Sequence, residues 1–317
     1  MFVTIAPVFA LILLGYFAVR LGVLQRGQEK VLGAFVLNFA LPALVFDALA
    51  TRDLASVVDW SYLLPYATGS LGAMALVLMI ALKFQGRPPT LAVFQAMGSG
   101  FSNTGLIGYP IALRVIGEPA GVVLALSVLA ENVVLLPLTL VLAEAAAGGR
   151  ARLATVAVRA VVRVARMPIV VAILAGALFA ALDAAPPRLV TDLAGLLAGA
   201  AAPMALMAVG GSLVAVNLAS RRSDILKVAL FKLLLHPFAV ALAVWGMPME
   251  RSQLSAVAVL LAGMPMLSIY PVLAGRHGHG EVSAATLALT TMLSFATVPT
   301  LLWALTWFGW LPPPSTG

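Results

Sequence analysis

Long apolar stretches separated by short polar connections run along the whole chain. A membrane-spanning helix needs about 20 mostly apolar residues to cross roughly 30 Å of hydrocarbon. The pattern predicts ten such helices, over residues 2–20, 30–50, 61–83, 91–116, 119–143, 165–183, 189–216, 226–246, 252–275 and 282–309. The first stretch has no basic residue before Leu11 and no small-residue cleavage pattern, so we interpret it as a span rather than a signal peptide. We therefore expect an all-α integral membrane protein.

The composition agrees with this pattern. Hydrophobic residues make up 62% of the 317 residues, charged residues 10%, and the mean hydropathy is +1.07. This leaves too little polar surface for a soluble protein of this length, and the chain has no long hydrophilic segment that would form a second, soluble domain. The absence of cysteine excludes disulfides, iron–sulfur clusters and thiol catalysis.

The basic residues are distributed unevenly between the connections. With ten spans, the odd-numbered connections hold Arg20, Arg26, Lys30, Lys83, Arg87, Arg150, Arg152, Arg159, Arg163, Arg166, Arg221, Arg222, Lys227 and Arg276. The even-numbered connections hold only Arg52, Arg114, Arg188 and Arg251. The positive-inside rule then predicts cytoplasmic odd connections and both termini outside. The net charge of +7 follows from this topology, and nothing supports a nucleic-acid partner.

One proline pattern occurs twice. Pro7, Pro42 and the pair Tyr109-Pro110 each recur 161 residues later, as Pro168, Pro203 and Tyr270-Pro271. This repetition predicts two five-helix repeats, residues 1–147 and 168–317. Because five is an odd number, the second repeat enters the membrane from the opposite side, so the repeats are inverted.

A short basic connection, residues 148–167, joins the two repeats. Its arginines at 152, 159, 163 and 166 stand among valines and alanines. This spacing suits an amphipathic helix on the inner leaflet, and an ordinary loop that fixes the topology is the alternative.

The fourth and ninth predicted spans contain unusual concentrations of helix-breaking residues. Residues 98–110 include four glycines, a proline and several hydroxyl or amide side chains, and residues 263–271 repeat the pattern more sparsely. A membrane helix tolerates such a run only where its freed backbone groups meet protein, water or ligand. We predict discontinuous helices four and nine that cross at the midplane, with breaks around Gly108–Pro110 and Ile269–Pro271.

The substrate is expected to bind where these breaks meet. Half-helix N-termini favour anionic groups, and uncharged side chains can bind a carboxylate while still releasing it. The alternative is that these side chains only satisfy the broken backbone. The predicted substrate-binding residues are Asn103, Thr104, Gly105, Gly108, Tyr109, Pro110, Ser268, Ile269, Tyr270 and Pro271.

Ionisable residues inside spans are usually functional or paired. Glu131, followed by Asn132, lies deep in the fifth span, so this pair is the candidate site for a coupling proton or cation; a structural, hydrogen-bonded glutamic acid is the alternative. Residues near span ends, namely Asp47, Glu144, Lys227 and Lys232, are expected to be interfacial. His236 is expected to be a packing residue, and His277 with His279 falls short of a metal site.

The sequence lacks the motifs of several other function classes. The chain has no metalloprotease motif, nucleophile elbow or P-loop, so we do not expect an enzyme, a cofactor or a metal site. A channel would show rings of like charge or a selectivity filter, whereas the predicted site has uncharged side chains at broken helices, which favours a carrier. A membrane receptor that senses a ligand in the same pocket without transporting it is the remaining alternative to a carrier.

Three motifs resemble the auxin efflux carrier family, which includes plant auxin exporters and bacterial malonate and malate permeases. They are Leu41–Phe46 (LPALVF), Asn103–Pro110 (NTGLIGYP) and Pro203–Leu213 (PMALMAVGGSL). The resemblance spans the chain and implies a fold similar to the bile-acid sodium symporters, with spans one, two, six and seven as a scaffold and the others as a mobile domain. It also implies elevator-like transport and a carboxylate-binding role for Asn103. The short central connection differs from the long loop of the plant proteins.

The expected function is therefore secondary-active transport of a small organic anion, a carboxylate, across the inner membrane of a bacterium, with malonate, malate and an indole acid as open alternatives. The expected partners are the substrate, a coupling proton or sodium ion, membrane lipid, and a second copy of the chain that pairs through the scaffold helices. The sequence indicates neither the direction of transport nor the coupling ion.

Overall fold

The computed structural model describes residues 2–50, 59–148, 153–215, 222–247 and 253–311, and this described part of the chain is helical, without strands. In the first half the elements are α1 (Phe2–Arg20), α2 (Gln28–Phe35), η1 (Val36–Ala40), α3 (Leu41–Ala50), α5 (Trp60–Met79), η2 (Ile80–Phe84), α6 (Pro89–Gly100), η3 (Thr104–Gly108), α7 (Tyr109–Ile116), α8 (Ala120–Leu129), η4 (Ala130–Leu135) and α9 (Leu136–Ala146). The remaining elements are α10 (Leu153–Ala165), α11 (Pro168–Ala181), α12 (Arg188–Ser212), η5 (Leu213–Ala215), α13 (Arg222–Leu230), η6 (Phe231–Leu235), α14 (His236–Gly246), α15 (Gln253–Ala262), α16 (Tyr270–Gly275) and α17 (Gly280–Trp307).

All ten predicted stretches contain helix, but not all form one continuous spanning helix. Within the described residues, six helices are long and apolar enough to cross a membrane: Gln28–Ala50, Trp60–Phe84, Ala120–Ala146, Arg188–Ser212, Ser223–Gly246 and Gly280–Trp307. A seventh candidate is α10 with α11, which meet at an angle of 65°. The other predicted spans are the shorter α1 and two interrupted segments, α6 to α7 and α15 to α16.

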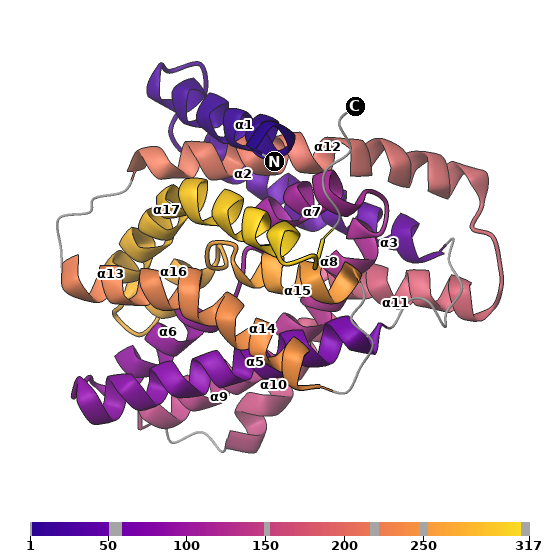
Figure 1. Cartoon of the computed structure of the whole chain (residues 1–317). Coiled ribbons are helices and arrows are strands. Elements are labelled where there is room, and N and C mark those ends of the chain that lie inside the picture. Colours follow the sequence, from indigo (N-terminus) through magenta and orange to yellow (C-terminus); the bar gives the residue numbers. More distant parts are fainter. Residues whose placement is uncertain (1, 51–58, 149–152, 216–221, 248–252, 312–317) are drawn as a thin grey trace.

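One group of helices is held together by close glycine contacts. Figure 1 shows α1 lying along α12. A Cβ atom added to Gly210 would lie 1.8 Å from the carbonyl oxygen of Ile12, and one added to Gly15 would lie 2.2 Å from that of Met207. Only glycine allows the two backbones to approach this closely. Helix α12 also packs on α2 and α3, and α3 packs on α11.

A second group of helices surrounds the two interrupted segments. Helix α5 packs on α6, α14 and α15, while α9 packs on α6 and α17 packs on α16. The two groups meet where η3 contacts α12 and where α8 contacts α3. The first interruption therefore lies at the boundary between the groups.

Most of the widened, π-helical turns precede a proline. Turns η1, η3, η4 and η6 each end one residue before an X-Pro pair, at Pro42, Pro110, Pro137 and Pro237. Proline has no N–H to donate, and its ring clashes with the carbonyl of the preceding turn. A wider turn accommodates both defects, and such turns are frequent at functional sites.

Candidate functional site

The interrupted segments touch each other at their breaks. Residues 101–103 between α6 and η3 are not helical, and neither are residues 263–269 between α15 and α16. The backbone N–H of Asn103 donates to the carbonyl oxygen of Pro265 at 2.7 Å, and its side-chain Nδ2 donates to Ser268 Oγ at 2.8 Å. Freed backbone groups of one break are therefore satisfied by the other.

The position of the first break differs from the prediction. Residues from Thr104 onwards are helical, and Gly108 to Pro110 lie inside the continuous segment formed by η3 and α7. The reason is that the π-helical turn absorbs the proline defect, so the chain breaks instead after Gly100, where Asn103 Oδ1 accepts from the backbone N–H of Leu106 and caps the new helix. In the second segment, Tyr270-Pro271 follows the break and begins α16.

Glu131 binds the first break directly. Its Oε1 accepts from the backbone N–H of Ser102 at 3.0 Å and from the hydroxyl of Tyr66 at 2.6 Å. Its Oε2 accepts from the hydroxyl of Thr104 at 3.2 Å. The side chain is buried, and these three donors compensate its carboxylate for lost hydration.

Lys232, in η6, contacts the same break, so the expectation that it is interfacial is wrong. It is fully buried, and its Nζ donates to Ser102 Oγ at 2.8 Å and to the carbonyl oxygen of Ala262 at 2.7 Å. Nζ also lies 2.6 Å from His236 Nδ1, and His236 Nε2 lies 2.7 Å from Ser70 Oγ. His236 is thus a buried, hydrogen-bonded side chain within this polar network.

The two charged groups match the dipoles of the half-helices. Glu131 lies at the N-terminal end of the segment formed by η3 and α7, where free N–H groups favour an anion. Lys232 binds the last residue of α15, Ala262, where free carbonyls favour a cation. Ser102 connects them, since its backbone N–H donates to Glu131 and its hydroxyl oxygen accepts from Lys232.

The structure brings most of the predicted site residues together and separates others. Asn103, Thr104 and Ser268 lie at the contact between the breaks, and Gly105 and Gly108 line the adjoining turn. A Cβ atom on Gly108 would lie 2.9 Å from a methyl group of Leu261, so this turn packs on α15.

The remaining predicted residues have other partners. Tyr109 and Tyr270 are buried, and Tyr270 is hydrogen-bonded to Ser283 on α17. Pro110 is buried, whereas Ile269 and Pro271 are half-buried. Asn132 donates to Val128 in its own helix, away from the ligands of Glu131.

A sequence signal for Lys232 was available. Glu131, Thr104 and Lys232 lie five or six residues before a proline, each in a π-helical turn. A search for polar residues five or six positions before an intramembrane proline would have found all three.

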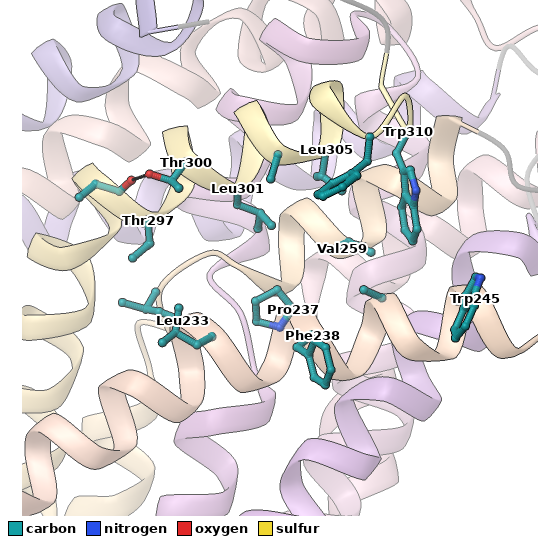
Figure 2. Close-up of a pocket in the computed structure, with 15 residues that line it drawn as sticks. Leu233, Pro237, Phe238, Trp245, Val259, Thr297, Thr300, Leu301, Leu305 and Trp310 are labelled. Atoms are coloured by element: carbon teal, nitrogen blue, oxygen red, sulfur yellow. Dashed lines mark hydrogen bonds between the residues drawn. The ribbon is translucent and has the colours of Figure 1, made fainter.

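A separate apolar groove lies between α14, α15 and α17. Its volume is about 720 Å³, and its walls include Leu233, Phe238, Trp245 and Leu301 (Figure 2). Thr300 also lines the groove, and its hydroxyl donates a hydrogen bond to the carbonyl oxygen of Ala296. Because no charged side chain lines the groove, it does not suit a small anion.

Among the described residues, no group of three or more potential metal ligands occurs. His277 and His279 instead lie beside Phe94, with ring centroids 5.1 Å and 6.2 Å away, and His279 Nε2 is 3.1 Å from the hydroxyl of Thr90.

The sequence matches the family described as "Membrane transport protein" over residues 1–304. The chain belongs to this family. The resemblance to auxin efflux carriers is thereby confirmed, and the protein is an integral membrane transporter.

Curated relatives agree with this assignment. A protein of Rhizobium meliloti (strain 1021) with the printed name "Putative malonate transporter" is 31% identical over 300 residues, which cover 94% of each chain. An "Uncharacterized transporter" of Methanothermobacter thermautotrophicus is 27% identical over 307 residues, covering 95% of this chain and 96% of that protein. The mouse "Lysosomal cholesterol signaling protein" matches over 114 residues only, which are 13% of its length.

Proposed function

We propose that this transporter is a carrier of a small organic anion, a mono- or dicarboxylate, which binds at the contact between the two helix breaks. The observation that carries the proposal is that Glu131 and Lys232 both bind Ser102 in the first break, next to Asn103, which joins this break to the second one at the boundary of two helix groups. The printed name of the Rhizobium relative makes malonate the first substrate to test.

We further propose ten spans arranged as two inverted repeats, residues 1–147 and 168–317. The packing supports this arrangement, because α1 of the first half pairs with α12 of the second, while α11 of the second half pairs with α3 of the first. At the offset of 161 residues, α1 corresponds to α11 and α3 to part of α12, so the contact of α1 with α12 has its counterpart in the contact of α11 with α3. The group formed by α1, α2, α3, α11 and α12 would be the scaffold, and the second group would move as an elevator.

The polar network at the break favours a proton as the coupling ion. Lys232 already places an ammonium group between Ser102 and the end of α15, where a metal cation would find its carbonyl ligand. Glu131 is the titratable acid that binds the break directly, and its Tyr66 and Thr104 partners hold it in place. Imposed proton and sodium gradients across proteoliposomes separate the two coupling modes.

The orientation follows from the charge distribution. With fourteen basic residues on odd connections and four on even ones, we propose that both termini face outside and that the protein lies in a bacterial inner membrane. Labelling of cysteines introduced at Thr316 and Gly148 from opposite sides of the membrane tests this topology. Labelling of both from one side would contradict it.

The decisive experiment measures malonate uptake and binding by the purified protein with Asn103 changed. The amide Nδ2 has two hydrogens, and one is used by Ser268, so the other can reach a carboxylate. Asn103→Ala should weaken substrate binding roughly ten- to hundredfold, as expected for a lost hydrogen bond to a charged group. Asn38→Ala is the matched control, because Asn38 is exposed and bonds only to Ala34 of its own helix.

A receptor that uses the same pocket is the second candidate, and the same preparation distinguishes it. A carrier accumulates labelled substrate inside proteoliposomes, whereas a receptor only binds it. Unchanged binding in a folded Asn103→Ala protein would mean that Asn103 is solely a helix cap and that the site lies elsewhere.

A further inference from the structure

Helix α10 has an unusual division of its surface. Its buried side rests on α9 through Ala160 and Val164, whose exposed fractions are 4% and 5%. Val156 and Ala157 are half-buried, and the exposed part of the helix contains an apolar row and a basic row. Neither exposed row is explained by the contact with α9.

The apolar row consists of Val158, Val161 and Val162, which are 62%, 58% and 42% exposed. Their spacing, i, i+3 and i+4, places them on one side of the helix. A contiguous row of uncovered valines is unfavourable in water and suits a hydrocarbon environment.

The basic row lies beside the valines. Arg159, Arg163 and Arg166 follow the spacing i, i+4 and i+7, and all three are exposed. The sequence from Leu153 to Arg166 contains no acidic residue. Arginine side chains next to an apolar row can extend to lipid phosphates while their methylene groups remain in the apolar layer.

Helices α10 and α11 meet at an angle of 65°. Helix α11 has no charged residue, which suits the spanning direction, and a helix bent away from it by this angle is directed toward the membrane surface. We propose that α10 lies in the interface and binds anionic phospholipid, with Arg159, Arg163 and Arg166 on the phosphates and the three valines among the acyl chains. This inference does not depend on the transported substrate.

Single-cysteine labelling tests the depth of the two rows in the full-length protein, because the native chain has no cysteine. Spin labels at Val158→Cys and Val161→Cys, in vesicles containing phosphatidylglycerol, should be accessible to oxygen and protected from a water-soluble nickel chelate. The matched control is Arg163→Cys, since Arg163 is exposed within the basic row and its label should show the reverse. Chelate-accessible labels at 158 and 161, or disulfide cross-links between copies there, would overturn the proposal; cross-links would identify a second copy as the occupant.

Lipid selectivity provides the second test. Added phosphatidylglycerol should raise the unfolding temperature of the detergent-purified protein more than phosphatidylcholine does. The R159Q/R163Q/R166Q variant should bind phosphatidylglycerol roughly a hundredfold more weakly. The R26Q/K30Q/K83Q variant removes the same charge from other exposed positions and should retain the selectivity. Equal loss in both variants would show a general charge effect and overturn a specific surface on α10.

Discussion

The two helix breaks share a sequence pattern and differ in chemistry. The first, residues 101–103, is short and is bound by charged side chains from η4 and η6. The second, residues 263–269, is longer and contains the fully buried side chains of Met264 and Met266. It supplies the carbonyl oxygen of Pro265 and one hydroxyl, that of Ser268, to the contact.

The difference shows that the repeated Tyr-Pro pair preserves an interruption of the helix without preserving its ligands. Pro271 lies at the start of a half-helix, directly after the break, whereas Pro110 lies inside a half-helix and follows a π-helical turn. The polar groups that surround the first break come from other elements. The centre of the proposed site therefore lies at the first break, with the second as its apolar partner.

Removing Lys232 should have the largest effect, because it addresses the charges that distinguish the first break. Lys232→Met leaves Glu131 buried without its cationic neighbour, which should lower the free energy of unfolding by about 3–5 kcal/mol. Thermal unfolding in detergent measures the loss. The double variant Glu131→Gln with Lys232→Met removes both charges and should recover most of the stability. A single variant as stable as the native protein would contradict this account of the network.

Adding one methyl group beside each break should affect the first more strongly. A Cβ atom at Gly100 would lie 2.2 Å from Met74 Cγ and 3.1 Å from the carbonyl oxygen of Ser70. At Gly263 the closest atom, at 2.4 Å, is a terminal methyl group of Leu301, which can rotate away. Gly100→Ala should cost about 1–3 kcal/mol and Gly263→Ala clearly less. Thermal unfolding of both variants in detergent measures the two losses of stability. A larger loss for Gly263→Ala than for Gly100→Ala would mean that the first break is the more adaptable one.

The hydrogen bond between the breaks provides a smaller comparison. Asn103→Ala loses both the helix cap and the bond to Ser268, for about 1–2 kcal/mol of stability, whereas Ser268→Ala loses the bond alone, for about 0.5–1 kcal/mol. A double-mutant cycle isolates the shared bond. Additive losses would indicate that the two side chains do not interact.

The prolines should give the smallest effects, and only the change at Pro271 should be destabilising. Pro271→Ala removes a proline from the first turn of α16, and the greater freedom of the unfolded chain should lower stability by about 0.4–1 kcal/mol. Pro110→Ala restores an N–H inside a continuous helical segment and should leave stability unchanged or slightly raised. Equal destabilisation by both would indicate that Pro110 also shapes a break.

The sequence by itself determined that the chain lies in a lipid bilayer, that it is helical, and where the apolar segments approximately begin and end. The reason is that a bilayer imposes length and hydropathy on every segment that crosses it. The clustering of glycine, proline and polar residues in residues 98–110 and 263–271 also identified the two segments that are interrupted, since proline removes a backbone donor regardless of its surroundings, although the first break lies at residues 101–103 and not around Gly108–Pro110. Asn103, Thr104 and Ser268 were selected on this local basis.

Only the tertiary structure decided which distant groups meet at the break. Lys232 lies 130 positions from Ser102 and looked interfacial because its distance from a span end is a local property, whereas its burial depends on packing against α5, α6 and α15. The exact break after Gly100 likewise depends on competition between a π-helical turn, which absorbs Pro110, and the side chains that satisfy residues 101–103. Hydropathy and proline chemistry act within a segment, but the partners of a freed backbone group are set by the helices that pack around it.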